Sequence, residues 1–375
     1  MPVVSIDQPT IAEVRFKTAA HDADASRPRA RVLTGDRPTG PLHLGHLVGT
    51  LQNRVRLQDA YDCTFIVADM HMLTTRSAPE QIAEIDANAR GLVLDALSAG
   101  LDPARVTFYL QSLVPEVLEL AGLFQSLVSV NRLERIPALK DMARDTGQEM
   151  SFALLGYPVL QAADILAMRA EAVPVGKDNY AYVEVTREIA RRFNARYGEV
   201  FPEPETIAGD VPTLIGIDGQ RKMSKSLGNA IALSDPPPVV RKKVMGMYTD
   251  PNRLTASTPG RVEGNPVFAY LDAFGTDHAA IDDLKDRYRA GTVGDVEVKA
   301  YLVEVLEAIL QPMRERREMY AGPGVVEALL EEGSGRVRTH TQETLRLARE
   351  AMGFGGVHRR MHRKARQAAA RDGLS

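Results

Sequence analysis

The chain has no tryptophan and only one cysteine, Cys63, among its 375 residues. A single cysteine cannot form an internal disulfide, and it excludes zinc sites built from several thiolates. The apolar share of 44% and the charged share of 25% are nevertheless ordinary for a globular protein. Low cysteine use fits a reducing compartment, so we expect a cytoplasmic protein.

Long apolar runs are also missing. No run of about 18 apolar residues occurs, so we expect no membrane-spanning helix and no membrane partner. Residues 1–30 contain several acids and no apolar block of signal-peptide length. We therefore expect them to form a polar N-terminal extension and expect no secretion signal.

An excess of positive charge is missing as well, because the net charge is −3. A protein that binds nucleic acid over its whole surface is usually strongly basic, so any such contact must be local. Residues 356–375 form a basic C-terminal tail with six Lys or Arg side chains. The sequence leaves two interpretations open, a solvated frayed tail or an arm that contacts phosphates.

Two common nucleotide motifs, the P-loop GxxxxGK[ST] and the dinucleotide fingerprint GxGxxG, do not occur. The chain does contain continuous apolar segments that alternate with amphipathic ones. Because strands without polar alternation that are separated by helices indicate a parallel sheet, we predict a Rossmann-like doubly wound α/β domain over 31–230. Residues 231–355 show helical periodicity without strand signals and predict an all-helical domain with a terminal helix. Strands are expected at 30–35, 63–71, 106–112 and 172–179, and helices at 41–60, 79–100, 114–130, 158–169, 182–198 and 295–320.

The stretch VLTGDRPTGPLHLGHLVGT places His43 and His46 just after the first predicted strand. We expect Pro41 in the first helical turn, which leaves backbone N–H groups and the positive end of the helix dipole free at residues 40–44. Gly45 has no side chain and lets a flat ligand approach. This pattern favours phosphate binding. A metal site would lack a third ligand, and a purely structural role for the two histidines is the remaining alternative.

A second motif, KMSKS at 222–226, follows the turn signal Asp218-Gly219. Alone it describes a basic surface loop. Together with the upstream HLGH it resembles the signature pair of the class I aminoacyl-tRNA synthetases. The segments YPVLQAADIL, VPVGKDN, EVTREIARRFNARYGEVFPEP and KMSKSLGNAIAL further resemble the tryptophanyl-tRNA synthetases, in order and over nearly the whole chain from about Val32.

The helix predicted near 158–169 has features suited to an aromatic substrate. Tyr157, Gln161 and Asp164 are spaced to share one helix face, and Asp164 lies among apolar neighbours. A buried carboxylate needs a partner, and an indole N–H is a donor that it can accept, although a structural pairing of Asp164 is the alternative. By resemblance, the tryptophan pocket comprises Asp164, Tyr157, Gln161, His71, Val173 and Val175.

The resemblance implies an ATP-dependent, AMP-forming tryptophan–tRNA ligase. Such an enzyme joins L-tryptophan to ATP, with Mg²⁺ bound to the nucleotide, and transfers the activated amino acid to tRNA-Trp. The family is homodimeric and binds the anticodon with its helical domain. The implied catalytic residues are His43, His46, Lys222 and Lys225, and the implied ATP site comprises Arg37, Pro38, Thr39, Gly45, His46, Gly176, Lys177, Asp178, Thr213, Lys222, Met223, Ser224, Lys225 and Ser226.

Several alternatives remain open at the level of the sequence. Gln161 and Asp164 could equally hold a phenol hydroxyl, which keeps tyrosyl-tRNA synthetase as a rival. The segment VGKDN departs from the commoner VGEDQ at Lys177 and Asn179, where the substrate ammonium is held in the family. A specialised paralogue, such as a resistance or modified-indole isoform with a secondary role, is therefore a second alternative. A small-substrate nucleotidyltransferase with a similar histidine motif is disfavoured by the long helical segment.

Overall fold

The computed structural model of the chain describes residues 29–147, 149–176, 179–208, 214–225, 227–249, 253, 255 and 257–371. Residues 1–28 of the predicted N-terminal extension lie outside this part. So do four residues of the predicted ATP site: Lys177, Asp178, Thr213 and Ser226.

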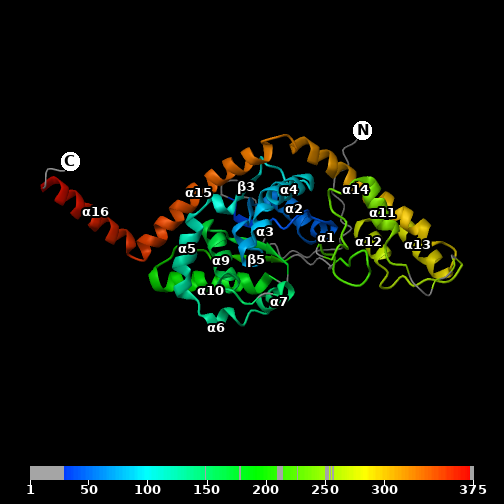
Figure 1. Cartoon of the computed structure of the whole chain (residues 1–375), viewed down its shortest axis with the longest axis horizontal. Helices are drawn as coiled ribbons and strands as arrows, with labels where there is room; N and C mark the ends of the chain where they lie inside the picture. The colour runs from blue at the N-terminus through cyan, green and yellow to red at the C-terminus, as the bar shows by residue number, and fades with distance from the viewer. Residues whose placement is uncertain are drawn as a thin grey trace.

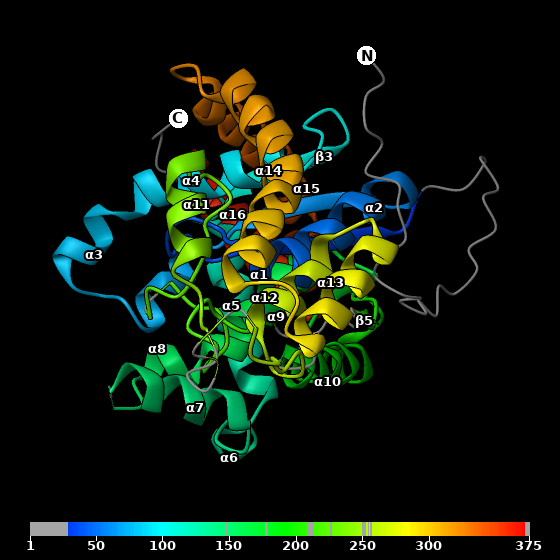
Figure 2. The same ribbon diagram turned by 90° about the vertical axis from the view of Figure 1, so that its right-hand side faces the viewer.

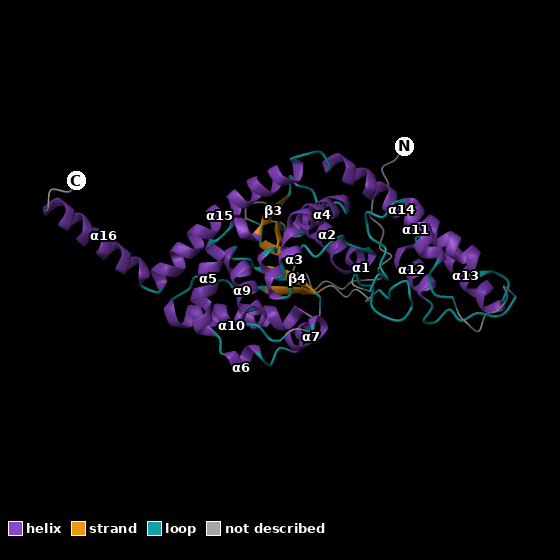
Figure 3. Cartoon of the chain, viewed as in Figure 1, coloured by secondary structure: helices purple, strands orange, loops and turns teal. Residues whose placement is uncertain are grey.

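Five parallel strands form one sheet in the order β3-β2-β1-β4-β5 (Figures 1 and 3). The chain builds outward from β1 in one direction and then returns to add β4 on its other side, which confirms the predicted doubly wound fold. In such a sheet, ligands bind in a crevice at the point where the strand order reverses. Here that point lies between β1 and β4. The short β5 was not predicted because ETIA forms no long apolar run. The strands are β1 (Arg31–Asp36), β2 (Asp62–Val67), β3 (Val106–Leu110), β4 (Ala172–Val175) and β5 (Glu205–Ala208).

Helices cover both faces of the sheet. Successive strand residues point to opposite faces, so Val32 and Phe65 pack with one group of helices and Leu33 and Ile66 with the other. This double burial explains why the strands read as continuous apolar runs. On one side lie α1 (Leu44–His46), the π-helical turn η1 (Leu47–Leu51), α2 (Gln52–Ala60), α3 (Pro79–Ala83) and α4 (Ile85–Ser98). On the other side, α5 (Glu116–Phe124), α9 (Tyr157–Ala167) and α10 (Tyr180–Tyr197) carry the core.

Short helices complete the sheet domain. Three 3₁₀ turns follow strands β2 and β3 and helix α5, namely η2 (Met70–Thr74), η3 (Gln111–Leu113) and η4 (Gln125–Leu127). Figure 2 shows α7 and α8 on the side of the molecule opposite the long helix α14 (Asp295–Tyr320). The short helices are α6 (Val130–Leu133), α7 (Pro137–Thr146) and α8 (Phe152–Leu155).

The chain after residue 231 is helical in its described part, as predicted. Helices α11 (Pro237–Met245), α12 (Pro266–Phe274) and α13 (His278–Ala290) form one end of the molecule (Figure 1). The long α14 (Asp295–Tyr320) packs on α4, and α15 (Val325–Ala351) continues across the sheet domain to β3, α5 and α9. The last helix, α16 (Phe354–Arg371), extends beyond α15 at the opposite end.

The contact between α15 and β3 is a close approach of two backbones. A Cβ atom placed on Gly333 would lie 1.8 Å from the carbonyl oxygen of Phe108. One residue further on, the hydroxyl of Ser334 accepts the N–H of Leu110 at 3.1 Å. The helix therefore covers the outer edge of β3, and only glycine permits this separation.

We expect the Gly333→Ala variant to lose about 2–3 kcal/mol of unfolding free energy, because the added methyl group forces α15 away from β3. Gly335→Ala in the same helix is the matched control, since a Cβ there meets no atom within 4 Å. That change should be neutral or stabilise by about 0.5–1 kcal/mol through helix propensity. Urea unfolding of the two variants measures the difference. Equal stabilities would show that the close approach is not a constraint.

Candidate active site

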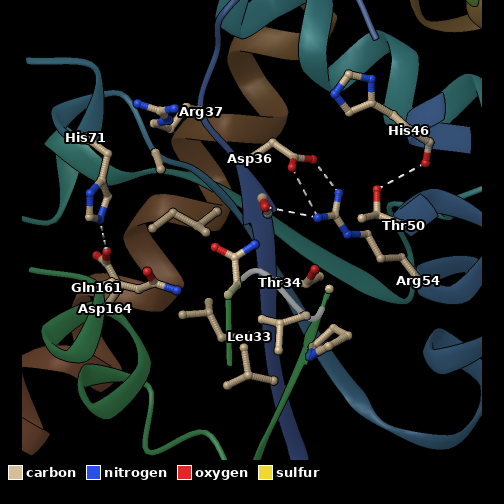
Figure 4. Close-up of a pocket in the computed structure, with 18 of the residues that line it drawn as sticks. Leu33, Thr34, Asp36, Arg37, His46, Thr50, Arg54, His71, Gln161 and Asp164 are labelled. Carbon is tan, nitrogen blue, oxygen red and sulfur yellow. Dashed lines mark hydrogen bonds and ion pairs between the residues drawn. The ribbon is translucent and has the colours of Figure 1, made fainter. Parts of the chain in front are cut away.

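A cavity of about 450 Å³ opens at the carboxyl ends of β1 and β4 (Figure 4). It lies where the strand order reverses, which is the expected ligand position in a doubly wound sheet. All six residues of the predicted tryptophan pocket line it: His71, Tyr157, Gln161, Asp164, Val173 and Val175. From the predicted ATP site, Arg37, Thr39, His46, Gly176 and Lys225 line the same cavity.

The structure corrects the predicted start of the first helix. The helix begins at Leu44 with His43 as its N-cap, so Pro41 lies before it and not in its first turn. The backbone N–H groups are also already paired rather than free. Leu42 N–H donates to Asp95, Leu44 N–H to the carbonyl of Ile231, and Gly45 N–H to His43 Nδ1. These three N–H groups are therefore not free to bind an anion.

The KMSKS segment docks directly on the HLGH turn. Leu44 and Leu42 exchange backbone hydrogen bonds with Ile231 and Leu233, at 3.0 and 2.9 Å. Beside them, the sulfur of Met223 accepts the N–H of Gly45 at 3.3 Å. The two motifs, far apart in the chain, are thereby held together, and the flat face expected at Gly45 is covered by Met223.

The two lysines of KMSKS are placed differently. Lys225 lines the cavity, and its ammonium donates to the carbonyl of Gly40 at 2.7 Å and to the hydroxyl of Thr39 at 3.2 Å. Lys222 is exposed and does not line the cavity, although its charge acts on both histidines. The remaining described residues of the predicted ATP site flank the cavity without lining it, namely Pro38, Gly45, Met223 and Ser224.

His43 and His46 lie in contact, with their ring centroids 3.9 Å apart. Burial, together with the other histidine and Lys225, lowers the pKa of His43 to about 3. Burial is also the main cause that lowers the pKa of His46 to about 4, against the opposing charge of Asp36. Both imidazoles are therefore neutral at pH 7, and they can donate or accept hydrogen bonds without adding positive charge.

The carboxyl end of β1 carries an ion pair that the sequence did not reveal. Arg54 of α2 is buried, binds Asp36, and donates to the carbonyl of Gly35 at 3.0 Å (Figure 4). Burial raises the pKa of Asp36, but the charge and hydrogen bond of Arg54 outweigh it and hold the pKa below its usual value. Position alone could have indicated Asp36, because it is the last residue of β1, just before Arg37.

Asp164 is 3% exposed and already has two partners. His71 Nε2 lies 2.9 Å from its Oδ2, and the amide of Gln111 donates to both carboxylate oxygens at 2.9 Å. Burial raises the pKa of Asp164 above its usual value, and the hydrogen bond from His71 opposes this shift. Gln111 was not predicted as a site residue, although it follows β3 at the same edge of the sheet.

Two buried polar atoms at this end of the cavity have no hydrogen-bond partner in the described structure, Gln161 Oε1 and His71 Nδ1. The ring of His71 also packs against that of Tyr157, with centroids 4.5 Å apart. Figure 4 shows Gln161 and Asp164 close together at one side of the cavity. Orphaned buried acceptors are costly, so this end of the cavity is suited to a flat apolar ligand with a polar N–H or O–H.

Comparison with known proteins agrees with this arrangement. Residues 25–311 match the family model of the tRNA synthetases class I (W and Y). The chain is 57% identical over 326 residues to the tryptophan–tRNA ligase of Treponema pallidum, covering 86% of this chain and 97% of that protein. It is 46% identical over 330 residues to that of Borreliella burgdorferi, covering 87% and 94%. The chain belongs to the tryptophanyl-tRNA synthetase family.

Solved structures of this family share the fold. The tryptophanyl-tRNA synthetase of Campylobacter jejuni, complexed with ADP and tryptophan, superposes with a TM-score of 0.77 at 33% identity, covering 86% of this chain and 99% of that one. The tyrosyl-tRNA synthetase of Archaeoglobus fulgidus, complexed with L-tyrosine, gives a TM-score of 0.59 at 24% identity and shows a common fold only.

The described residues contain no group of three or more His, Cys, Asp or Glu side chains placed to hold a metal ion. None of the described helices has both the length and the apolar character needed to cross a bilayer.

In this synthetase, a buried carboxylate joins the signature turn to the helical part. Asp95 of α4 is 1% exposed, accepts the N–H of Leu42 at 2.7 Å and forms an ion pair with Arg317 of α14. Burial raises the pKa of Asp95, and the charge of Arg317 opposes that shift. The residue just before the HLGH motif is thus held by a carboxylate that itself depends on α14.

We expect Arg317→Met to lower the unfolding free energy by about 3 kcal/mol, because it leaves the Asp95 charge buried without a cation. Adding Asp95→Asn removes that charge, so the double variant should be more stable than the sum of the two single changes predicts. Urea unfolding of the four proteins measures this coupling.

The surface pair of Arg338 with Glu116 provides a control. Arg338→Met should cost at most about 1 kcal/mol. Strict additivity between the changes at Arg317 and Asp95 would contradict the proposed dependence.

Proposed function

We propose that this cavity is where the enzyme activates L-tryptophan with ATP. Membership of the tryptophanyl-tRNA synthetases makes the chain an aminoacyl-tRNA ligase. The observation that carries the assignment to this cavity is its lining. One continuous surface joins the pocket of Gln161 and Asp164 to the signature turn at His46 and to the cation of Lys225.

In the first step, the tryptophan carboxylate attacks the α-phosphorus of ATP. A new carboxyl–phosphate bond forms as the bond to the β-phosphate breaks, and pyrophosphate leaves with the electron pair. Charge builds up on the phosphate oxygens, so the protein's task is to position the reactants and stabilise that charge.

Lys225 is the cation best placed for this task, because it lines the cavity beside Thr39 and the signature turn. Arg37 lines the cavity as well and adds a second positive charge. We assign Lys222 to the departing pyrophosphate, reached by movement of its exposed side chain. His43 and His46 act as neutral hydrogen-bond donors.

Asp164 is the proposed reader of the indole N–H. A carboxylate has about four acceptor positions, so the bonds from His71 and Gln111 leave capacity for another donor. Gln161 Oε1, which has no partner in the described structure, is the competing acceptor. We assign the indole ring to His71, Val173 and Val175. We assign the ammonium group to Tyr157 and Asn179, which line the same cavity.

In the second step, the aminoacyl group passes to the terminal ribose of tRNA-Trp and AMP is released. We assign anticodon binding to the helical part, with single-stranded bases read by stacking and edge contacts. Mg²⁺ is expected to arrive on the ATP phosphates, since the described residues offer no ligand cluster of their own. We propose a homodimer on the basis of the family resemblance. We propose a cytoplasmic location because the only cysteine of the sequence, Cys63, is free and buried.

Amino-acid-dependent exchange of pyrophosphate into ATP tests the function. Among the twenty amino acids, only tryptophan should support exchange. Exchange with tyrosine alone would assign the rival specificity, and no exchange with any would indicate a paralogue that has lost activation.

The role of Asp164 is tested in the same assay by comparing tryptophan with 3-benzothienylalanine, which replaces the indole N–H by sulfur. The wild type should prefer tryptophan in kcat/KM by about 10²-fold, the value of a hydrogen bond to a charged group. Asp164→Ala should reduce that preference towards one, and Gln161→Met should preserve it. If the role of Asp164 is purely structural, Asp164→Ala should lower kcat/KM for both substrates equally. Loss of the preference in Gln161→Met alone would make Gln161 the residue that binds the indole N–H.

The lowered pKa of Lys225 predicts that kcat/KM for ATP depends on pH. Burial lowers its pKa to about 8, and the neighbouring Arg76 and Arg37 add to the shift while Asp36 and Asp95 oppose it. Its ammonium form is needed to hold phosphate, so kcat/KM for ATP should fall as the pH rises through about 8. Lys225→Arg keeps a cation there at higher pH and should remove this decline. The exposed Lys222 supplies the control, because Lys222→Arg should leave the decline in kcat/KM in place. If the decline persists in Lys225→Arg, a group other than Lys225 causes it.

A further inference from the structure

The C-terminal helix α16 is an exposed arm. It extends past the end of α15 and away from the body of the molecule (Figures 1 and 3). Every residue from Arg359 to Ala368 is exposed. It lies beyond residues 25–311, which match the synthetase family model.

The charge of this arm differs from that of the rest of the chain. Residues 354–371 contain six Lys or Arg side chains and no acid, whereas the whole chain has a net charge of −3. The remainder therefore carries a net charge of −9, which disfavours polyanions. A polyanionic substrate needs a local cationic site to bind such a protein.

The cations of α15 and α16 also differ in their partners. On α15, Arg338, Arg346 and Arg349 each form an ion pair with a glutamate. On α16, Arg359 reaches an acid, Glu350, at 3.4 Å. Within the described part of the chain, no acid pairs with four other cations of α16, namely Arg360, Arg363, Lys364 and Arg366.

Three arginines of the arm are arranged on one helix face. Arg359, Arg363 and Arg366 follow a spacing of four and three residues, so they lie on one side over about 10 Å of helix. His362 and Gln367 border the same concave surface. Planar guanidinium groups in such a row match the oxygens of successive phosphates.

We propose that this face of α16 binds the phosphate backbone of the tRNA substrate. The inference rests on the proposed function, which makes tRNA the polyanion that this enzyme must bind. Contacts of this kind position a nucleic acid and do not read its sequence. The arm therefore contributes affinity, while identity is read elsewhere.

The opposite face of α16 favours RNA over a lipid surface. Its apolar stripe contains Phe354, Val357 and Met361 near the start of the helix, and only the small Ala365 and Ala368 further on. Helices that lie on membranes present large apolar side chains along their length. The outer half of α16 would bury little area in lipid but keeps its full positive charge.

The test measures the affinity for a transcript of a tryptophan tRNA over a range of salt concentrations. Changing Arg359, Arg363 and Arg366 together to Gln should weaken binding at least ten-fold in low salt. The slope of log affinity against log salt should decrease by about two to three, as expected for three lost phosphate contacts. Changing the same three residues to Lys should restore most of the slope, because the positive charges return. Tryptophan-dependent pyrophosphate exchange needs no tRNA and should be the same in the Gln variant and the wild type. Absence of exchange from both proteins would contradict the proposed function rather than the arm.

A second triple variant controls for net charge. Arg144, Arg191 and Arg196 are exposed arginines of α7 and α10, and their change to Gln should leave the salt slope unchanged. An equal effect of both triple variants would overturn a local site on α16, as would unchanged tRNA binding in the first variant. The proposal also fails if the α16 variant keeps its tRNA affinity but loses binding to vesicles containing phosphatidylserine. A third variant changes Phe354, Val357 and Met361 to Ala. The proposal fails equally if this variant has an altered oligomeric mass while the arginine variant keeps its tRNA affinity.

Discussion

The active site depends on hydrogen bonds between two backbone segments that are distant in sequence. Leu42 and Leu44 pair with Ile231 and Leu233, and Gly45 is covered by Met223, 178 residues away. Because the bonds at Leu42 and Leu44 are made by the main chain, they fix the path of the signature turn and of the segment just after KMSKS whatever their side chains do. This path brings the ammonium of Lys225 to the signature turn, so the site exists only where the two segments meet.

The charge distribution of the site follows from burial. Imidazoles enclosed beside lysines are neutral, whereas Lys225 keeps its proton at pH 7 because acidic groups partly offset its desolvation. The guanidinium of Arg54 is occupied by Asp36 and is not free to bind a ligand. Positive charge at the cavity therefore resides mainly on Lys225 and Arg37, which line it and, among the described residues, are not paired with a carboxylate there as Arg54 is.

Local pattern predicted much of this structure, and long-range contacts account for what it missed. Apolar runs identified four of the five strands. Helix-face spacing indicated that Tyr157, Gln161 and Asp164 share one side of a helix, and all three line the cavity. The late start of the first helix was not predictable, because the residues before Leu44 pair with a segment far downstream. Nor could spacing reveal that Gln111 would bind Asp164, or that only one of two neighbouring lysines faces the cavity.

The glycine contact between α15 and β3 has a consequence for the solution behaviour of the protein. An uncovered outer strand is a template on which another chain can add a strand, and sheets that carry one are prone to aggregate. Here the helix backbone lies against Phe108, and Ser334 takes up the N–H of Leu110. The outer edge of β3 is therefore closed to pairing with another chain. A chain that has lost α15 would have a weaker core and would also expose this edge to aggregation.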